Sequence, residues 1–137
     1  MTVREGIRHR SFWLIASMDI CSLFTFLYVS SVFKTMAIQL GNGALDDHWL
    51  TLIGAVGGLA NGGSRIFWGY FQDIFGFKKI YAFILVTQVL VSLTLTSVVS
   101  NKMLYMVWIL IGYNCLGAHF VLFPTVLLKV FGLKSGG

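Results

Sequence analysis

The chain has 137 residues, of which 57% are hydrophobic and only 11% are charged, and its mean hydropathy is +0.82. A soluble domain usually carries about twice that charged fraction, so the composition argues against a soluble globular protein. The net charge of +5 does not require a nucleic-acid partner, because basic flanks of membrane helices face anionic lipid headgroups. We therefore expect an all-α membrane protein whose surroundings are the lipid bilayer.

Four apolar blocks follow one another along the chain. Each block is near or above the ~20 residues that cross ~30 Å of hydrocarbon as a helix. Transmembrane β-strands would instead appear as ~10-residue alternating segments. The sequence predicts four transmembrane helices within residues 1–137, at about residues 11–40, 49–71, 80–100 and 104–130.

Basic residues predict the orientation of these helices. If the helices alternate in direction, the side away from both termini holds Asp46, Asp47, Lys102 and Lys34. The other side is more basic, so the positive-inside rule predicts that both termini are cytoplasmic. The basic residues on that side are Arg4, Arg8, Arg10, Lys78, Lys79, Lys129 and Lys134.

The first predicted helix contains Asp19. An acid inside a membrane helix is a functional candidate by default, so Asp19 is a candidate coupling group, and a purely structural pairing stays equally open. We expect Lys34 to extend toward the outer surface. Cys21 and Cys115 lack any metal-ligand or redox spacing and are interpreted as packing residues.

The second predicted helix has two different faces. At 100° per residue, Gly54, Gly58 and Gly62 fall on one face together with Asn61 and Arg65. The glycines form GxxxG steps, which predict close packing against another helix. We therefore expect Asn61 and Arg65 to face protein or a water-filled cavity. The opposite, bulky face carries Val56, Leu59, Ile66, Phe67 and Tyr70.

Arg65 is the unusual residue of this helix. A cation near the bilayer centre costs on the order of 3 kcal/mol. Its guanidinium either extends to the membrane surface or pairs with a carboxylate such as Asp19 for structure alone, or it offers a planar fork to an anionic substrate. Its position beside small and polar residues favours substrate binding.

The last two predicted helices differ in polarity. The third is a plain supporting helix with Gln88 as its one larger polar group. In the fourth, Asn114 is a candidate pore-lining, substrate-binding residue, and His119 is a candidate proton-coupling group or a packing residue. Pro124 is expected to kink or end this helix.

The loop after the second predicted helix has a specific pattern. "GYFQDIFGFKK" places Gly69, Asp73, Gly76, Lys78 and Lys79 as G-x-x-x-D-x-x-G-x-K-K. It resembles the loop motif of the major facilitator superfamily, which implies a twelve-helix transporter in which this loop acts as a conformational latch. In physical terms, a glycine permits a tight turn and an aspartate at a helix end can accept hydrogen bonds from a neighbouring helix N-terminus.

The stretch "RIFWGYFQDIFG" resembles the eighth helix of the oxalate/formate antiporter and monocarboxylate transporter families. There an arginine four residues before the motif's first glycine binds the substrate carboxylate, and Arg65 and Gly69 have that spacing. Monocarboxylate transporters often have an aspartate where Asn61 stands, and Asn61 cannot titrate, which favours the antiporter-like branch. "FPTVLLKVFGLKSGG" resembles the end of the tenth helix, so the chain is similar to helices 7–10.

This resemblance implies secondary transport of small organic anions by alternating access between two six-helix halves. We expect this chain alone not to transport, and to work with the missing helices in cis or in trans. Two alternatives stay open: a complete four-helix protein such as a small multidrug exporter, and a non-transporting subunit. The sequence has no P-loop, catalytic triad pattern or paired-histidine metal motif, so we expect neither an enzyme nor a cofactor or metal.

Overall fold

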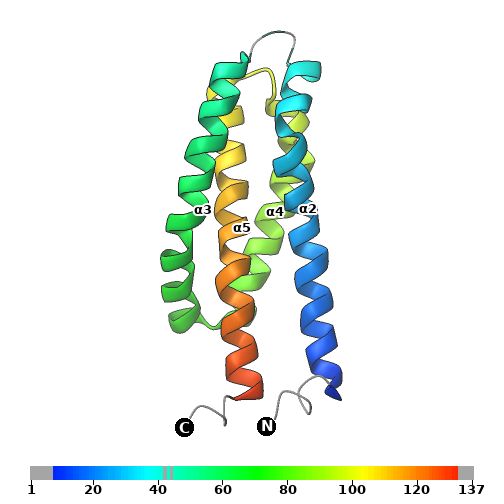
Figure 1. Cartoon of the computed structure of the whole chain (residues 1–137), viewed down its shortest axis with the longest axis vertical. Helices are drawn as coiled ribbons and strands as arrows, with labels where there is room; N and C mark the ends of the chain where they lie inside the picture. Colours follow the sequence, from blue (N-terminus) through cyan, green and yellow to red (C-terminus); the bar gives the residue numbers. More distant parts are fainter. Residues whose placement is uncertain (1–7, 42, 44, 133–137) are drawn as a thin grey trace.

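A computed structural model describes residues 8–41, 43 and 45–132. In this part of the chain all regular structure is helical, which confirms the prediction of an all-α protein with four long helices. Figure 1 shows the helices running side by side and alternating in direction, with both termini at the same end. The helices are α2 (Arg10–Leu40), α3 (Asp47–Phe75), α4 (Phe77–Val98) and α5 (Lys102–Phe131).

Three helices, α2, α4 and α5, are long and apolar enough to cross a membrane by length and composition. Three of the four predicted membrane spans therefore meet the length and composition criterion, and α3 does not. Helix α3 is less apolar because it carries many glycines together with Asn61 and Arg65. It nevertheless joins the upper end of α2 to the lower end of α4 (Figure 1), so it must cross in any arrangement in which those two helices cross.

Side chains and a glycine define the ends of α3. Asp46 precedes the helix, and its side chain accepts a hydrogen bond from the backbone N–H of Trp49 at 3.0 Å. The helix ends at Phe75 because Gly76 has φ +83°, a conformation that other residues rarely adopt. The sequence predicted an end at Phe71. Because the helix in fact continues to Phe75, Arg65 lies ten residues, or about 15 Å, from its end.

Helix α5 is the central element of the fold. It packs against α2, α3 and α4, and half of its most apolar 18-residue stretch is buried within the chain, compared with 11% for α2. Fully buried Tyr105 and Ile109 form part of one cluster in its first half, and Ala118 and Leu122 belong to a second cluster further along. Large apolar side chains remain exposed on all four helices, as expected of surfaces that face lipid or further protein.

Pro124 does not end α5. The helix continues for seven residues to Phe131, close to the predicted bound of 130, so the alternative in which Pro124 ends the helix does not occur, and the alternative of a kink stays a prediction. Pro124 itself is exposed, and its missing N–H removes one hydrogen bond from the helix without stopping it. The packing of α5 against three neighbours stabilises the helical form on both sides of the proline.

Candidate functional site

The face of α3 that packs inside the chain lies next to the predicted glycine face and does not coincide with it. Apart from the backbone of α3 around it, a Cβ placed at Gly58 or Gly62 would meet no described atom within 4 Å, whereas a Cβ at Gly54 or Gly69 would make ordinary contacts with Phe33 or Val121. The predicted close packing at Gly58 and Gly62 thus does not occur among these four helices. The buried face of α3 consists of Leu50, Ile53, Gly57, Ser64, Trp68 and Gln72.

Close approach between helices occurs at other glycines. A methyl group at Gly57 would overlap the ring of Tyr113, and one at Gly112 would overlap the ring of Phe26. At Gly117 it would overlap the Ser64 hydroxyl. The sequence analysis did not single out these sites, because glycine spacing within one helix does not show which neighbour lies opposite.

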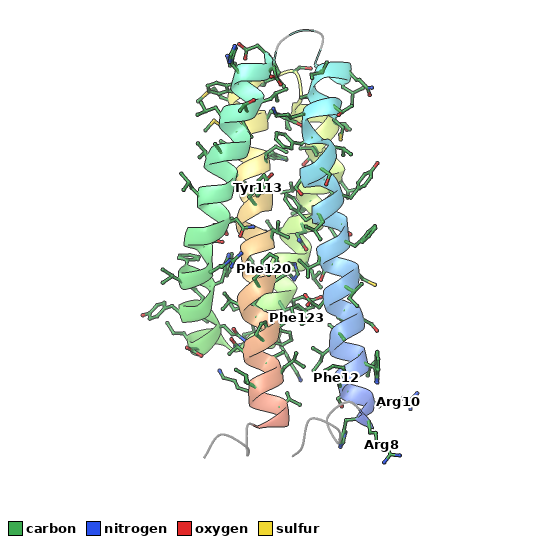
Figure 2. The ribbon with its side chains drawn as sticks, in the orientation of Figure 1. Arg8, Arg10, Phe12, Tyr113, Phe120 and Phe123 are labelled. Atoms are coloured by element: carbon green, nitrogen blue, oxygen red, sulfur yellow. The ribbon has the colours of Figure 1, made fainter. Side chains whose placement is uncertain are left out.

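Arg65 is held from two directions. Its Nη2 donates a hydrogen bond to the side-chain oxygen of Asn61 at 3.3 Å, and its guanidinium carbon lies 4.7 Å from the centre of the Phe120 ring. Figure 2 shows Phe120 on the side of α5 that faces α3. The interaction with the ring is a cation–π contact, which orients the planar fork. The sequence analysis missed Phe120, since nothing in its own neighbourhood on α5 points to Arg65.

No carboxylate of the described chain pairs with Arg65. Its side chain is exposed, as are Gly58 and Gly62 on the same face of α3 and the large apolar residues Ile66 and Phe67 on the bulky face. The predicted alternative, a structural pair between Arg65 and Asp19, does not form, because Asp19 faces His119 instead. The arginine therefore presents a positive charge on an otherwise apolar surface.

Asn114 connects two helices. Its side-chain oxygen accepts a hydrogen bond from the indole nitrogen of Trp68 at 2.8 Å, and its backbone oxygen lies 3.2 Å from the same nitrogen. Trp68 is buried and Asn114 is partly buried. This oxygen holds α3 to α5, so within these helices it serves packing, and a role in substrate binding stays a prediction.

The two candidate coupling residues meet in the fold. Nδ1 of His119 lies 3.8 Å from a carboxylate oxygen of Asp19, although the two residues are 100 positions apart in the sequence. Nε2 of His119 lies 3.3 Å from the side-chain oxygen of Gln88. Helix α4 is therefore more than the plain supporting helix that its composition indicated.

The loop motif lies at the end of the bundle that holds both termini (Figure 1). Asp73 pairs with Lys129 of α5 at 3.1 Å, whereas the sequence analysis expected it to accept from a helix N-terminus. Gly76 makes the one-residue turn between α3 and α4, and exposed Lys78 and Lys79 follow in the first turn of α4.

Several other predicted residues have defined places. Lys34 contacts Asp47 at 3.3 Å and the Thr51 hydroxyl at 2.8 Å, so it forms an exposed pair between α2 and α3. Cys115 is buried, but Cys21 is exposed, so the packing interpretation fails for Cys21 within this chain. Arg4 and Lys134 lie outside the described residues. In the described ranges, no three His, Cys, Asp or Glu side chains gather to hold a metal ion.

Comparison with known proteins gives one distant similarity. The chain is 22% identical over 140 residues to apicoplast pyruvate carrier 1 of Toxoplasma gondii, and the alignment covers 100% of this chain and 26% of the carrier. The chain thus spans about a quarter of the length of that curated relative. No family model and no solved structure matches the chain. The similarity and the three apolar helices together support an integral membrane protein.

Proposed function

We propose that this chain is part of a secondary transporter of the major facilitator superfamily that carries small organic anions of the monocarboxylate, oxalate or formate class. It would act by alternating access, together with further helices in cis or in trans, and not as an enzyme. The observation that carries the proposal is Arg65, a guanidinium oriented by Asn61 and Phe120 with no carboxylate partner in the described chain. Similarity to a pyruvate carrier supports the anion class, since pyruvate is a monocarboxylate.

The geometry of Arg65 suits a carboxylate ligand. An arginine has five N–H donors, and one on Nη2 is directed to Asn61. The remaining donors are available for a two-point contact with a planar carboxylate, which is the strongest pairing that arginine makes. Contact with the face of Phe120 restricts rotation of the guanidinium and so reduces the entropy lost when an anion binds.

The depth of Arg65 argues against a role at the membrane surface. Its position about 15 Å from the lower end of α3 is close to half of a ~30 Å hydrocarbon core. An uncompensated arginine there costs about 3 kcal/mol, and such residues usually face a protein interior or a polar cavity. The open glycine face at Gly58 and Gly62 lies on the same side of α3 and would let further helices approach the site.

The loop motif supplies the proposed latch. Asp73 and Lys129 join the lower ends of α3 and α5 through an exposed ion pair, which is weak enough to open and close during transport. Gly69 lies on the same helix as Asp73, and a Cβ placed there would touch Val121 of α5, so the two helices are close at this position. Breaking the ion pair would let the two helix ends separate while the buried packing above them is retained.

Orientation follows from the charge distribution. Arg8, Arg10, Lys78 and Lys79 lie at the end of the bundle that holds both termini, and the opposite end holds the pair Lys34 and Asp47. By the positive-inside rule this distribution favours the proposed orientation, with both termini in the cytoplasm or on the equivalent side of an organelle membrane.

The test is carboxylate uptake by proteoliposomes that contain the complete transporter. We expect Arg65→Gln to raise the concentration of labelled pyruvate, oxalate or formate needed for half-maximal uptake by about 10- to 100-fold, because a charge-assisted pair contributes about 1.5–3 kcal/mol. Arg65→Lys keeps the charge but loses the fork, and should retain only part of the affinity.

Lys34→Gln is the matched control, because it removes another cation that lies at the far end of the helices and bonds to Asp47. It should leave uptake unchanged. Normal uptake in both Arg65 variants would refute the assignment of that residue. Uptake by vesicles that contain this chain alone would refute the requirement for further helices.

A further inference from the structure

A buried polar cluster lies where α2, α4 and α5 meet, apart from Arg65. His119 of α5 is its centre and is 1% exposed, and Gln88 of α4 is 5% exposed. The hydroxyl of Tyr81 donates toward the Ser22 hydroxyl and the Met18 backbone oxygen, each at 3.2 Å. We define the cluster by its side chains: Asp19, Ser22, Tyr81, Gln88 and His119.

The cluster is one proton short of satisfying its groups. Nε2 of His119 faces the side-chain oxygen of Gln88, which only accepts hydrogen bonds; the neutral tautomer that satisfies this contact carries its ring proton on Nε2. Nδ1 then has a lone pair and faces a carboxylate oxygen of Asp19 at 3.8 Å, and neither atom has a hydrogen-bond partner in the described chain. Two acceptors that face each other in a buried position need a proton between them.

A cavity lies beside this position, between α2 and α4. It is partly open, has a volume of about 290 Å³, and is lined by the polar residues Ser22, Thr25, Gln88 and Ser92 together with Leu85, Val89 and Leu93. Gln88 and Ser22 belong both to the cavity wall and to the buried polar cluster. Its hydroxyl and amide groups provide hydrogen-bonding partners along one wall, and a chain of water and hydroxyl groups conducts protons.

We infer that Asp19 and His119 together hold one exchangeable proton, which reaches them through the cavity between α2 and α4. The proton bonds Nδ1 of His119 to the Asp19 carboxylate and so joins α5 to α2; its departure leaves two facing lone pairs and weakens that connection. The existence of this proton site does not depend on the proposed function. The role of its proton as the coupling ion of transport does rest on that function. The site would supply the titratable group that Asn61 cannot provide on α3.

Other titratable or charged residues lie on the helices that pack around Asp19 and His119. From α4, the Tyr81 ring lies 6.0 Å from the His119 ring, and from α2, Cys21 directly precedes Ser22, which the Tyr81 hydroxyl contacts. From α3, Arg65 contacts Asn61 and Phe120, and Asp73 is paired with Lys129. On α5 itself, Cys115 is buried one turn before His119. Among these groups of the described ranges, Asp19 and His119 are the pair whose partnerless acceptor atoms face each other.

The proton is observed directly by nitrogen NMR of ¹⁵N-histidine-labelled protein in lipid nanodiscs, combined with infrared absorption of protonated carboxyl groups, from about pH 5 to 8. Signals of His119 are those absent from His119→Gln. We expect either both ring nitrogens of His119 to carry protons, or Nε2 alone together with a carboxyl band that Asp19→Asn removes. Raising the pH should change the signals of both residues at one midpoint.

Asp47→Asn is the control, because Asp47 is exposed and pairs with Lys34; it should leave the carboxyl band and the His119 signals unchanged. A neutral ring protonated at Nδ1 beside an ionised Asp19 over the whole range would overturn the inference, since that is an ordinary hydrogen bond with no exchangeable proton. In transport assays, proton movement that accompanies carboxylate entry should be lost in Asp19→Asn.

The two proposals fail separately. If the NMR result holds while Arg65 variants transport normally, the proton site stands and the proposed substrate contact is wrong. If carboxylate uptake depends on Arg65 while His119 shows only the neutral Nδ1-protonated ring, the substrate contact stands and this inference is wrong.

Discussion

The indole nitrogen of Trp68 and the side-chain oxygen of Asn114 lie 2.8 Å apart and join α3 to α5, three residues after Arg65 along α3. Trp68 is 6% exposed, so this hydrogen bond is largely shielded from solvent or lipid headgroups. Because Arg65 lies on α3 and Phe120 on α5, the bond also fixes the relative position of the two elements that orient the guanidinium.

Trp68→Phe should lower the free energy of unfolding by about 1 kcal/mol, because it removes the donor and leaves the Asn114 oxygen with no partner of its own. Trp108→Phe is the matched control, since the Trp108 indole donates to Thr94 at 2.7 Å in an exposed position. Unfolding by sodium dodecyl sulfate, followed by circular dichroism in mixed micelles, measures both. An equal or larger loss in Trp108→Phe would contradict the importance of the buried bond.

Two glycine substitutions should have effects of opposite sign. Gly117→Ala places a methyl group against the Ser64 hydroxyl and should destabilise the chain by about 1–3 kcal/mol through overpacking. Gly62→Ala meets no atom within 4 Å and should stabilise α3 by up to about 1 kcal/mol, because alanine favours the helix. The same unfolding assay on this chain compares them.

The Gly62 substitution also reports on the surroundings of α3. If Gly62→Ala stabilises this chain but impairs transport by the complete protein, a further helix packs on the open glycine face. Destabilisation of this chain by Gly62→Ala, to the extent seen for Gly117→Ala, would mean that the helices pack in a different arrangement.

The ion pair between Asp73 and Lys129 should contribute less than about 1 kcal/mol, because the two side chains are 70% and 60% exposed. A double-mutant cycle with Asp73→Asn and Lys129→Gln measures the coupling energy, and the exposed pair of Lys34 and Asp47 provides a reference cycle. As a latch, the pair should affect transport rate far more than stability. Equal transport rates in wild type and Asp73→Asn would argue against the latch.

Phe120→Leu should weaken carboxylate uptake about two- to fivefold, because an exposed cation–π contact contributes about 0.5–1 kcal/mol. The effect should be smaller than that of Arg65→Gln, since the ring orients the charge and does not supply it. Phe67→Leu on the bulky face of α3 is the control and should leave uptake unchanged. Half-maximal substrate concentration is the quantity to compare.

Long apolar blocks were sufficient to predict four helices, because a block of about twenty apolar residues has few alternatives to a membrane helix. The end of α3 was placed four residues early, at Phe71 instead of Phe75. Hydropathy falls before the helix stops, and the stop itself is a backbone property of Gly76.

The helix faces predicted for α3 from periodicity agree only in part with the observed packing. Periodicity placed bulky residues such as Leu59 and Ile66 on an exposed face, as observed, but the predicted interior face with Gly62 and Arg65 is exposed within this chain as well. It could not show that Gly57, and not Gly58, contacts α5, because that depends on the shape of Tyr113 on the partner helix.

The sequence by itself determined the surroundings of this protein, because its long apolar blocks favour a lipid bilayer. The sequence also identified Arg65, Asp19 and His119 as polar groups within apolar helices. Only the tertiary structure decided their partners. Asp19 and His119 are 100 residues apart and meet because α2 and α5 pack together, while Arg65 and Phe120 meet because α3 packs on the other side of α5. Helical periodicity is a local property, whereas a contact between helices depends on how side chains on two surfaces fit together.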